Sequence, residues 1–223
     1  MQSMSETRRY QPILLSIYQQ YLEDTDPVDF VRAVSKRYVQ GTLERLVLDG
    51  DSVVRRASIL ALGYLGDFRV NHTVGRAMQD QDRTVRILAE KACRCVWNRP
   101  GDEGQRRELA DIVRLNATKQ YQESIQRASR LLADAPWFAE VWYQRGHAWF
   151  QLKELKQSIH DWHQALELNP YHFVAADAMG DAFLLLGKPG AALDAFRRAL
   201  RVNPDLERVK DKIARLSRQI EGE

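Results

Sequence analysis

Apolar residues along this chain recur at the spacing of amphipathic helices. In the last such segment, charged residues occupy one helical face and four apolar residues share the other: Val209, Ile213, Leu216 and Ile220. Nowhere does a stretch alternate apolar and polar residues as a half-buried strand would. The pattern therefore predicts an all-α protein with a helix near its C-terminal end that caps the fold.

Three evenly spaced prolines divide the C-terminal half into repeats. Pro136, Pro170 and Pro204 lie 34 residues apart. Proline ends a helix because its ring clashes with the preceding turn and because it has no backbone N–H to donate. The same shift superimposes Asn169 on Asn203, so the residue before the proline is repeated as well. Each copy is long enough for two helices and the turns that join them.

Within each copy, small and aromatic residues also recur. Gly146 in the first predicted helix and Trp162 in the second both have counterparts 34 residues later, and a glycine lets a partner helix approach closely. This order of aromatic, glycine, alanine and proline resembles the tetratricopeptide repeat. Residues 139–172 and 173–206 match the pattern closely, whereas residues 105–138 match it only in their second half.

The resemblance implies an α-α superhelix, or solenoid, in which the first helix of each pair lines a concave groove. Peptides and protein segments bind in such grooves. Carried over onto this sequence, the partner-binding residues are Tyr143, His147, Phe150, Asp177, Asp181 and Leu184. An aromatic patch beside two carboxylates suits a partner that has an apolar anchor and a nearby Lys or Arg. The alternative is that the groove packs on the N-terminal half of the chain or on a second copy of it.

The N-terminal half has a shorter period of 31 residues. Asp51 aligns with Asp82, and Arg55 aligns with Arg86. The two aspartates are expected to cap the helices that follow them, and we also expect them to form ion pairs with the two arginines. The stretch 51–67 resembles HEAT repeats, in particular the short variant named after phycobilisome lyases.

These periods predict five parts of the chain. They are an N-terminal helical extension (1–26), HEAT-like repeats (27–98), a hinge (99–104), three tetratricopeptide units of which the first is degenerate (105–206), and a capping helix (207–223).

Composition excludes some classes of protein and opens one alternative function. The 223 residues are 44% hydrophobic and 28% charged, which excludes a disordered chain, and the net charge is only +3. The whole excess lies in residues 1–100, which hold 15 Lys and Arg against 12 Asp and Glu. A basic HEAT-like half could bind nucleic-acid phosphates, which we regard as the less favoured function. The residues to suspect would be Arg55, Arg56, Arg86 and Arg94.

Residues capable of catalysis or metal binding form no convincing constellation. His160 and His163 are three residues apart on a predicted helix, but no third metal ligand is evident, so we expect exposed polar side chains. Cys93 and Cys95 point about 200° apart on a helix, which predicts one buried and one semi-exposed thiol. We therefore expect a non-enzymatic adaptor without metal or cofactor, in the cytoplasm, with no membrane association and with self-association left open.

Overall fold

The computed structural model describes residues 12–221, and all of the regular structure in that range is helical, as the apolar spacing predicts. The side chain of Ile220, expected on the apolar face of the last helix, lies outside the described residues. The helices of the N-terminal half are α1 (Ile13–Asp24), α2 (Pro27–Ser35), α3 (Gln40–Asp49), α4 (Ser52–Leu65), the 3-10 turn η1 (Phe68–Val70), α5 (Asn71–Ala77) and α6 (Arg83–Trp97). Those of the C-terminal half are α7 (Glu103–Ala117), α8 (Tyr121–Asp134), α9 (Ala139–Gln151), α10 (Leu155–Leu168), α11 (Phe173–Leu185), α12 (Pro189–Val202) and α13 (Glu207–Glu221).

Two helices of the N-terminal half begin where the repeated aspartates predict. The Asp51 side chain accepts hydrogen bonds from the N–H groups of Val53 and Val54, at 3.0 and 2.9 Å, and so caps α4. The Asp82 side chain accepts from the N–H of Val85 at 3.0 Å and caps α6. Each carboxylate satisfies backbone donors that have no partner within the helix. The prediction of both N-caps is confirmed.

Close packing within the C-terminal helix pairs depends on glycine. A Cβ on Gly146 would lie 2.8 Å from the Trp162 ring, and a Cβ on Gly180 would overlap the Phe196 ring. Trp162 and Phe196 are both fully buried. The same glycine–aromatic contact thus joins α9 to α10 and α11 to α12, 34 residues apart, as the repeat predicts.

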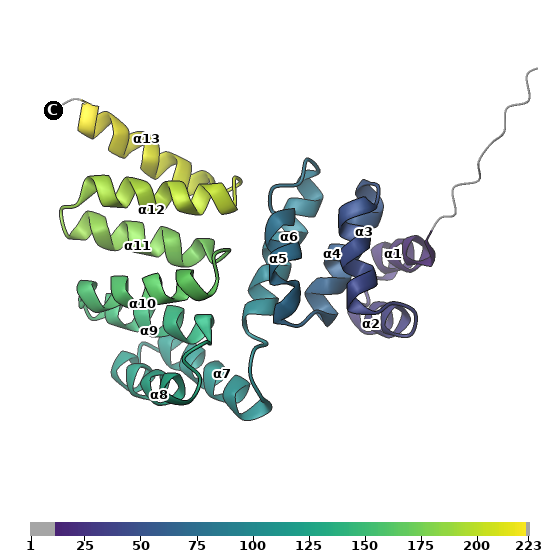
Figure 1. Ribbon diagram of the computed structural model, residues 1–223, viewed down its shortest axis with the longest axis horizontal. Helices are drawn as coiled ribbons and strands as arrows, with labels where there is room; N and C mark the ends of the chain where they lie inside the picture. The colour runs from purple at the N-terminus through teal and green to yellow at the C-terminus, as the bar shows by residue number, and fades with distance from the viewer. Residues whose placement is uncertain (1–11, 222–223) are drawn as a thin grey trace, which may run out of the picture.

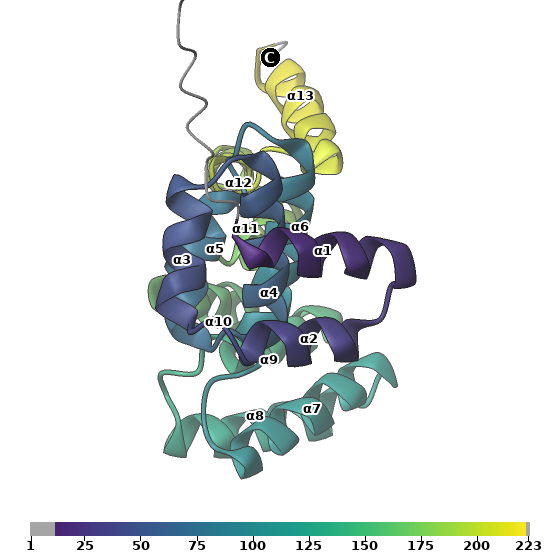
Figure 2. The ribbon, with the colours of Figure 1, turned by 90° about the vertical axis from the view of Figure 1, so that its right-hand side faces the viewer.

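The two halves face each other across the molecule. Helices α7 to α13 form one stack, and α5 and α6 of the N-terminal half lie along its edge (Figure 1). Seen from the side of the N-terminal half, α1 and α2 lie in front of α4, against which both pack (Figure 2). A single apolar core contains residues of both halves, whereas a second, smaller core joins only α7, α8, the loop before α9 and the start of α9.

Candidate functional site

The N-terminal half contacts two loops of the C-terminal stack. The first loop (169–172) joins α10 to α11, and the second loop (203–206) joins α12 to α13. In the first loop, the Asn71 side-chain amide donates a hydrogen bond to Oδ1 of Asn169 at 2.9 Å. In the second loop, the amide of Asn203 donates to Oε2 of Glu90 at 3.0 Å. Both loop asparagines are buried. The repeated residue before the proline is therefore the residue that fastens each loop to the other half.

Trp97, at the end of α6, fills the centre of this contact. Its ring stacks on His172 with 4.3 Å between centroids and lies 5.6 Å from the ring of Phe173. Its indole N–H donates to Oδ1 of Asn71 at 2.8 Å, so the buried polar atom has a partner. The arrangement connects α5, α6 and the first loop through one side chain.

Tyr171 adds a contact at the outer rim of the same loop. Its hydroxyl lies 2.8 Å from Nδ1 of His72. A Cβ on Gly75 of α5 would overlap the Tyr171 ring, so this approach requires a glycine.

The His172 ring that stacks on Trp97 also contacts the carboxylate of Glu140, and both of these side chains are buried. His172 Nε2 lies 3.1 Å from Oε2 of Glu140, and the other ring nitrogen, Nδ1, accepts the backbone N–H of Ala175 at 3.1 Å. Because Nδ1 accepts, the ring proton is on Nε2 and is donated to the carboxylate. Gln144 donates to Oε1 of the same Glu140 at 2.8 Å. The pair orients the His172 ring against Trp97.

Arg55 and Arg86 form ion pairs, but with other partners than we expected from the 31-residue period. Arg55 pairs with Asp80 of the next unit at 2.8 Å, and Arg86 pairs with Asp205 of the second loop at 2.8 Å. The predicted partners, Asp51 and Asp82, were wrong for these two arginines, because each guanidinium lies against a carboxylate further along the chain instead. The hydrogen bond from Arg86 lowers the pKa of Asp205. Equivalent arginines thus link each unit to the next, and the last link reaches the C-terminal half.

The other two arginines suspected of binding phosphate also have carboxylate partners. Arg56 pairs with Asp82, and its hydrogen bond lowers the pKa of that carboxyl to about 2. Arg94 pairs with Glu90 at 3.0 Å, and its guanidinium lies 5.0 Å from the centre of the Phe173 ring. The four suspected arginines are therefore paired with carboxylates inside the chain, which counts against a phosphate site built on them.

The two carboxylates predicted for the groove share a lysine of the capping helix. Lys212 Nζ lies 2.7 Å from Oδ1 of Asp177 and 2.8 Å from Oδ2 of Asp181. The ammonium group also lies 4.9 Å from the centre of the Phe196 ring. The structure brings the two carboxylates together as predicted, but it supplies their cation from within the chain.

The other predicted groove residues differ in how far they are covered. The Tyr143 ring lies 4.6 Å from His172, and burial raises the pKa of its hydroxyl. His147 packs edge-on against Tyr121 of α8, and burial lowers its pKa. Phe150 lies 5.5 Å from Trp162 of its own helix pair.

Leu184 differs from these three, because its side chain is among the exposed apolar ones, at 39%. The predicted surface therefore has a covered end at Tyr143, beside the N-terminal half, and an open end at Leu184.

The histidines and cysteines lie as their spacing predicts. His160 and His163 are exposed, and no group of three or more metal-ligating side chains occurs in the described part of the chain. Cys93 is buried and Cys95 is exposed, which confirms the prediction for the two thiols. No helix between residues 12 and 221 has the length and apolar character needed to cross a bilayer.

The sequence interpretation missed the residues that join the two halves. Trp97 and His172 carry no repeat signature, so no sequence signal pointed to them, whereas Glu140, which orients His172, was expected at the rim of the groove. Asn169 and Asn203 did have one, because the asparagine recurs before the proline whereas the earlier copy has Ala135 at that place.

Comparison with known proteins agrees with the C-terminal repeats. Two family models described as tetratricopeptide repeat match residues 139–172 and 176–206. Small glutamine-rich tetratricopeptide repeat-containing protein 2 of Saccharomyces cerevisiae is 26% identical over 113 residues, which are 48% of this chain and 33% of that protein. The chain thus spans about a third of the length of this relative.

Solved structures show the same fold. The first TPR of Spaghetti (RPAP3), bound to HSP90 peptide SRMEEVD, superposes with a TM-score of 0.50 and 20% identity over 52% of this chain and 93% of that one. MamA protein superposes with a TM-score of 0.50 and 18% identity over 70% of this chain and 82% of its own. These likenesses support the α-α superhelix, while the HEAT-like character of residues 27–98 stays a prediction. The chain carries tetratricopeptide repeats at residues 139–172 and 176–206.

Proposed function

We propose that this chain is a non-enzymatic scaffold that binds a peptide or protein segment on one surface of its tetratricopeptide repeats. We call this surface the α9–α11 face, and it consists of Tyr143, His147, Phe150, Asp177, Asp181 and Leu184. The observation that carries the proposal is the pair of tetratricopeptide repeats, whose first helices present these side chains. The Spaghetti structure, which has the same fold, holds an HSP90 peptide.

The open end of the α9–α11 face is where we place the partner. At the other end, Tyr143 is packed against His172, which in turn stacks on Trp97 of the N-terminal half. At the open end, Leu184 is exposed, and 40% of the Asp181 side chain is exposed. An apolar anchor of the partner would rest on Leu184.

The charge of this end is set by three side chains. Asp177 and Asp181 carry two negative charges, and Lys212 returns one positive charge between them. A Lys or Arg of the partner would therefore either bind Asp181 together with Lys212 or displace Lys212 from Asp181. This favours a partner with an apolar anchor next to a basic residue over a partner that offers a free carboxylate.

A selection from a random heptapeptide display library tests this function. We expect the wild-type protein to enrich sequences with Leu or Phe beside Lys or Arg. The variants Leu184→Asp and Asp181→Lys should reduce binding of these peptides by roughly tenfold or more, because each replaces a side chain that would contact the peptide. Neither side chain is part of the core, although Asp181→Lys also breaks the surface ion pair with Lys212. Asp194→Lys, an exposed change on α12, is the matched control and should bind normally. Equal binding by all four proteins would show that the α9–α11 face is not the binding surface.

A further inference from the structure

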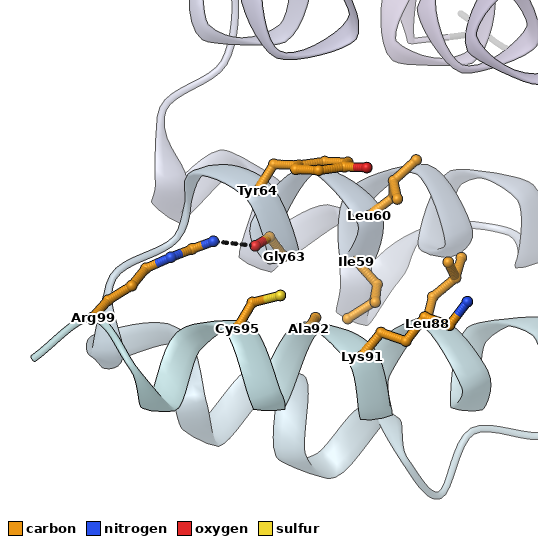
Figure 3. A pocket seen from close by; sticks show the side chains of 9 residues that line it. All are labelled: Ile59, Leu60, Gly63, Tyr64, Leu88, Lys91, Ala92, Cys95 and Arg99. Atoms are coloured by element: carbon orange, nitrogen blue, oxygen red, sulfur yellow. Dashed lines mark hydrogen bonds between the residues drawn. The ribbon is translucent and has the colours of Figure 1, made fainter. Parts of the chain in front are cut away.

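A pocket opens on the N-terminal half, away from the α9–α11 face. It lies between α4 and α6 and has a volume of about 230 Å³ (Figure 3). Ile59, Leu60 and Leu88 form part of its wall, and the Tyr64 ring lies along one side. Leu60 and Leu88 are half-buried, and Tyr64 is 41% exposed, so apolar surface is reachable from solvent.

The charged side chains that line this pocket are both cationic. Lys91 and Arg99 stand at its edge, and no Asp or Glu of the described chain lines it. Arg99 donates to the backbone carbonyls of Gly63 and Gly66. Neither Lys91 nor Arg99 has an ion-pair partner among the described residues.

The two cations therefore meet the apolar wall of the pocket with no carboxylate of the described chain beside them. Arg55, Arg56 and Arg86, which link the repeat units of the N-terminal half, have carboxylate partners, whereas within residues 12–221 the two cations beside the apolar pocket do not. Burial lowers the pKa of Arg99, so its positive charge is held there at a cost. An anionic group brought by a ligand would offset that cost. The site as a whole therefore suits a ligand that is apolar at one point and negatively charged beside it.

The size of the pocket narrows the ligand further. Pockets that hold drug-sized molecules or cofactors have volumes of roughly 300–1,000 Å³, and this one is smaller. One large side chain, such as Leu or Phe, fits the available space, and anchors of this kind dominate protein interfaces. We propose that the pocket binds a peptide segment of a second protein, which inserts one large apolar side chain and places Asp or Glu beside Lys91 and Arg99. The scaffold would then hold two partners of opposite charge on separate surfaces.

A natural reporter lies inside the pocket. Cys95 lines it and is exposed, so its thiol is accessible to an uncharged alkylating reagent. Cys93 is fully buried, and burial raises the pKa of its thiol, so it stays unreactive in the folded protein. The rate at which N-ethylmaleimide alkylates the native protein therefore measures how often the pocket is empty.

The test measures this rate with four probes. The first probe is a capped hexapeptide with Leu-Phe between two pairs of Glu. The second peptide has Lys in place of each Glu, and the third has Ala-Ala in place of Leu-Phe. The fourth probe is decanoate. We expect the first probe at saturation to slow alkylation of Cys95 roughly tenfold and the other three to leave it nearly unchanged. Lys91→Glu should weaken the first probe roughly fivefold or more. Arg45→Glu, an exposed change on α3, is the matched control.

Each probe can also overturn the proposal. If the Lys or Ala-Ala peptide protected Cys95 as well as the acidic one, the charge or the anchor would play no part. Protection by decanoate alone would make the occupant an aliphatic acid and not a protein segment. Unchanged alkylation with all probes would show that the pocket is unused. Rates are compared with and without probe for each variant, so a direct effect of Lys91 on the thiol cancels.

Discussion

The first and last helix pairs of the C-terminal half occupy equivalent places in the 34-residue repeat but pack differently. The α7–α8 pair shares a core of its own with the start of α9, whereas α11 and α12 share a core with the N-terminal half. The residue before the repeated proline follows the same division. It is Ala135 after α8, and it is a buried asparagine, Asn169 or Asn203, after α10 and α12.

Order along the chain does not decide which parts of this molecule pack together. Helix α7 follows α6 directly, yet the polar contacts of α6 reach loops that lie far beyond α7 in the sequence. Arg86 of α6 pairs with Asp205, 119 residues away, in the way that Arg55 pairs with Asp80 of the next unit. The second loop of the C-terminal half thus provides the carboxylate that the next repeat unit provides for Arg55.

Removing Trp97 should separate the halves most effectively. Trp97→Ala deletes a buried ring that contacts both His172 and Phe173, and truncations of this kind lower the free energy of unfolding by about 3–5 kcal/mol. Trp137→Ala is the matched control in the undocked region, since Trp137 is 48% exposed and stacks on Phe138. It should cost less than about 1.5 kcal/mol. Urea unfolding measures both, and equal losses would contradict the distinction.

Asn169→Ala should have the next largest effect. It leaves the buried amide of Asn71 without its acceptor, which costs about 1–3 kcal/mol of unfolding free energy. Asn203→Ala should cost less, because its partner Glu90 is only half-buried and can be hydrated. The order of the two losses in urea unfolding checks this, and a larger loss at Asn203 would count against the arrangement.

Arg86→Met should show a smaller effect that depends on salt. The pair with Asp205 is partly exposed, so we expect a loss of about 1 kcal/mol or less, and less still at high ionic strength. Arg55→Met, which breaks the equivalent pair inside the N-terminal half, should behave in the same way. A loss at Arg55 with none at Arg86 would indicate that the last link does not form.

His147 should contribute a small pH dependence. Its pKa is lowered in the folded protein, so below about pH 6.5 the unfolded chain takes up a proton more readily than the folded one. Stability is therefore lost as the pH falls from 7 to 5. The variant His147→Gln should lose less free energy of unfolding over this range than wild type. Parallel losses would show that His147 is not buried as described.

Much of the fold could be predicted from local sequence. The 34-residue spacing of proline, with Gly146 against Trp162, follows from how two helices pack within one repeat. The N-caps at Asp51 and Asp82 involve only the next few residues. Both features depend on neighbours in the chain, and the structure has them as predicted.

Contacts across the two halves could not be predicted in the same way. The expected pairing of Arg55 with Asp51 is wrong, because the Arg55 guanidinium lies against Asp80 of the next unit. Lys212 could not be matched to Asp181 without knowing how α13 lies on α11. In both cases the partner depends on how helices and units stack, which no local pattern specifies.

Helices α5 and α6 dock on the loops that follow α10 and α12 and cover one end of the α9–α11 face. A double-mutant cycle on Asn71 and Asn169 tests it most directly, since these side chains come from opposite halves and touch through one hydrogen bond. The free energies of unfolding of wild type, Asn71→Ala, Asn169→Ala and the double variant are measured in urea. We predict a coupling energy of about 1 kcal/mol. If the losses of the two single variants added up to the loss of the double variant within about 0.3 kcal/mol, the docking would be contradicted.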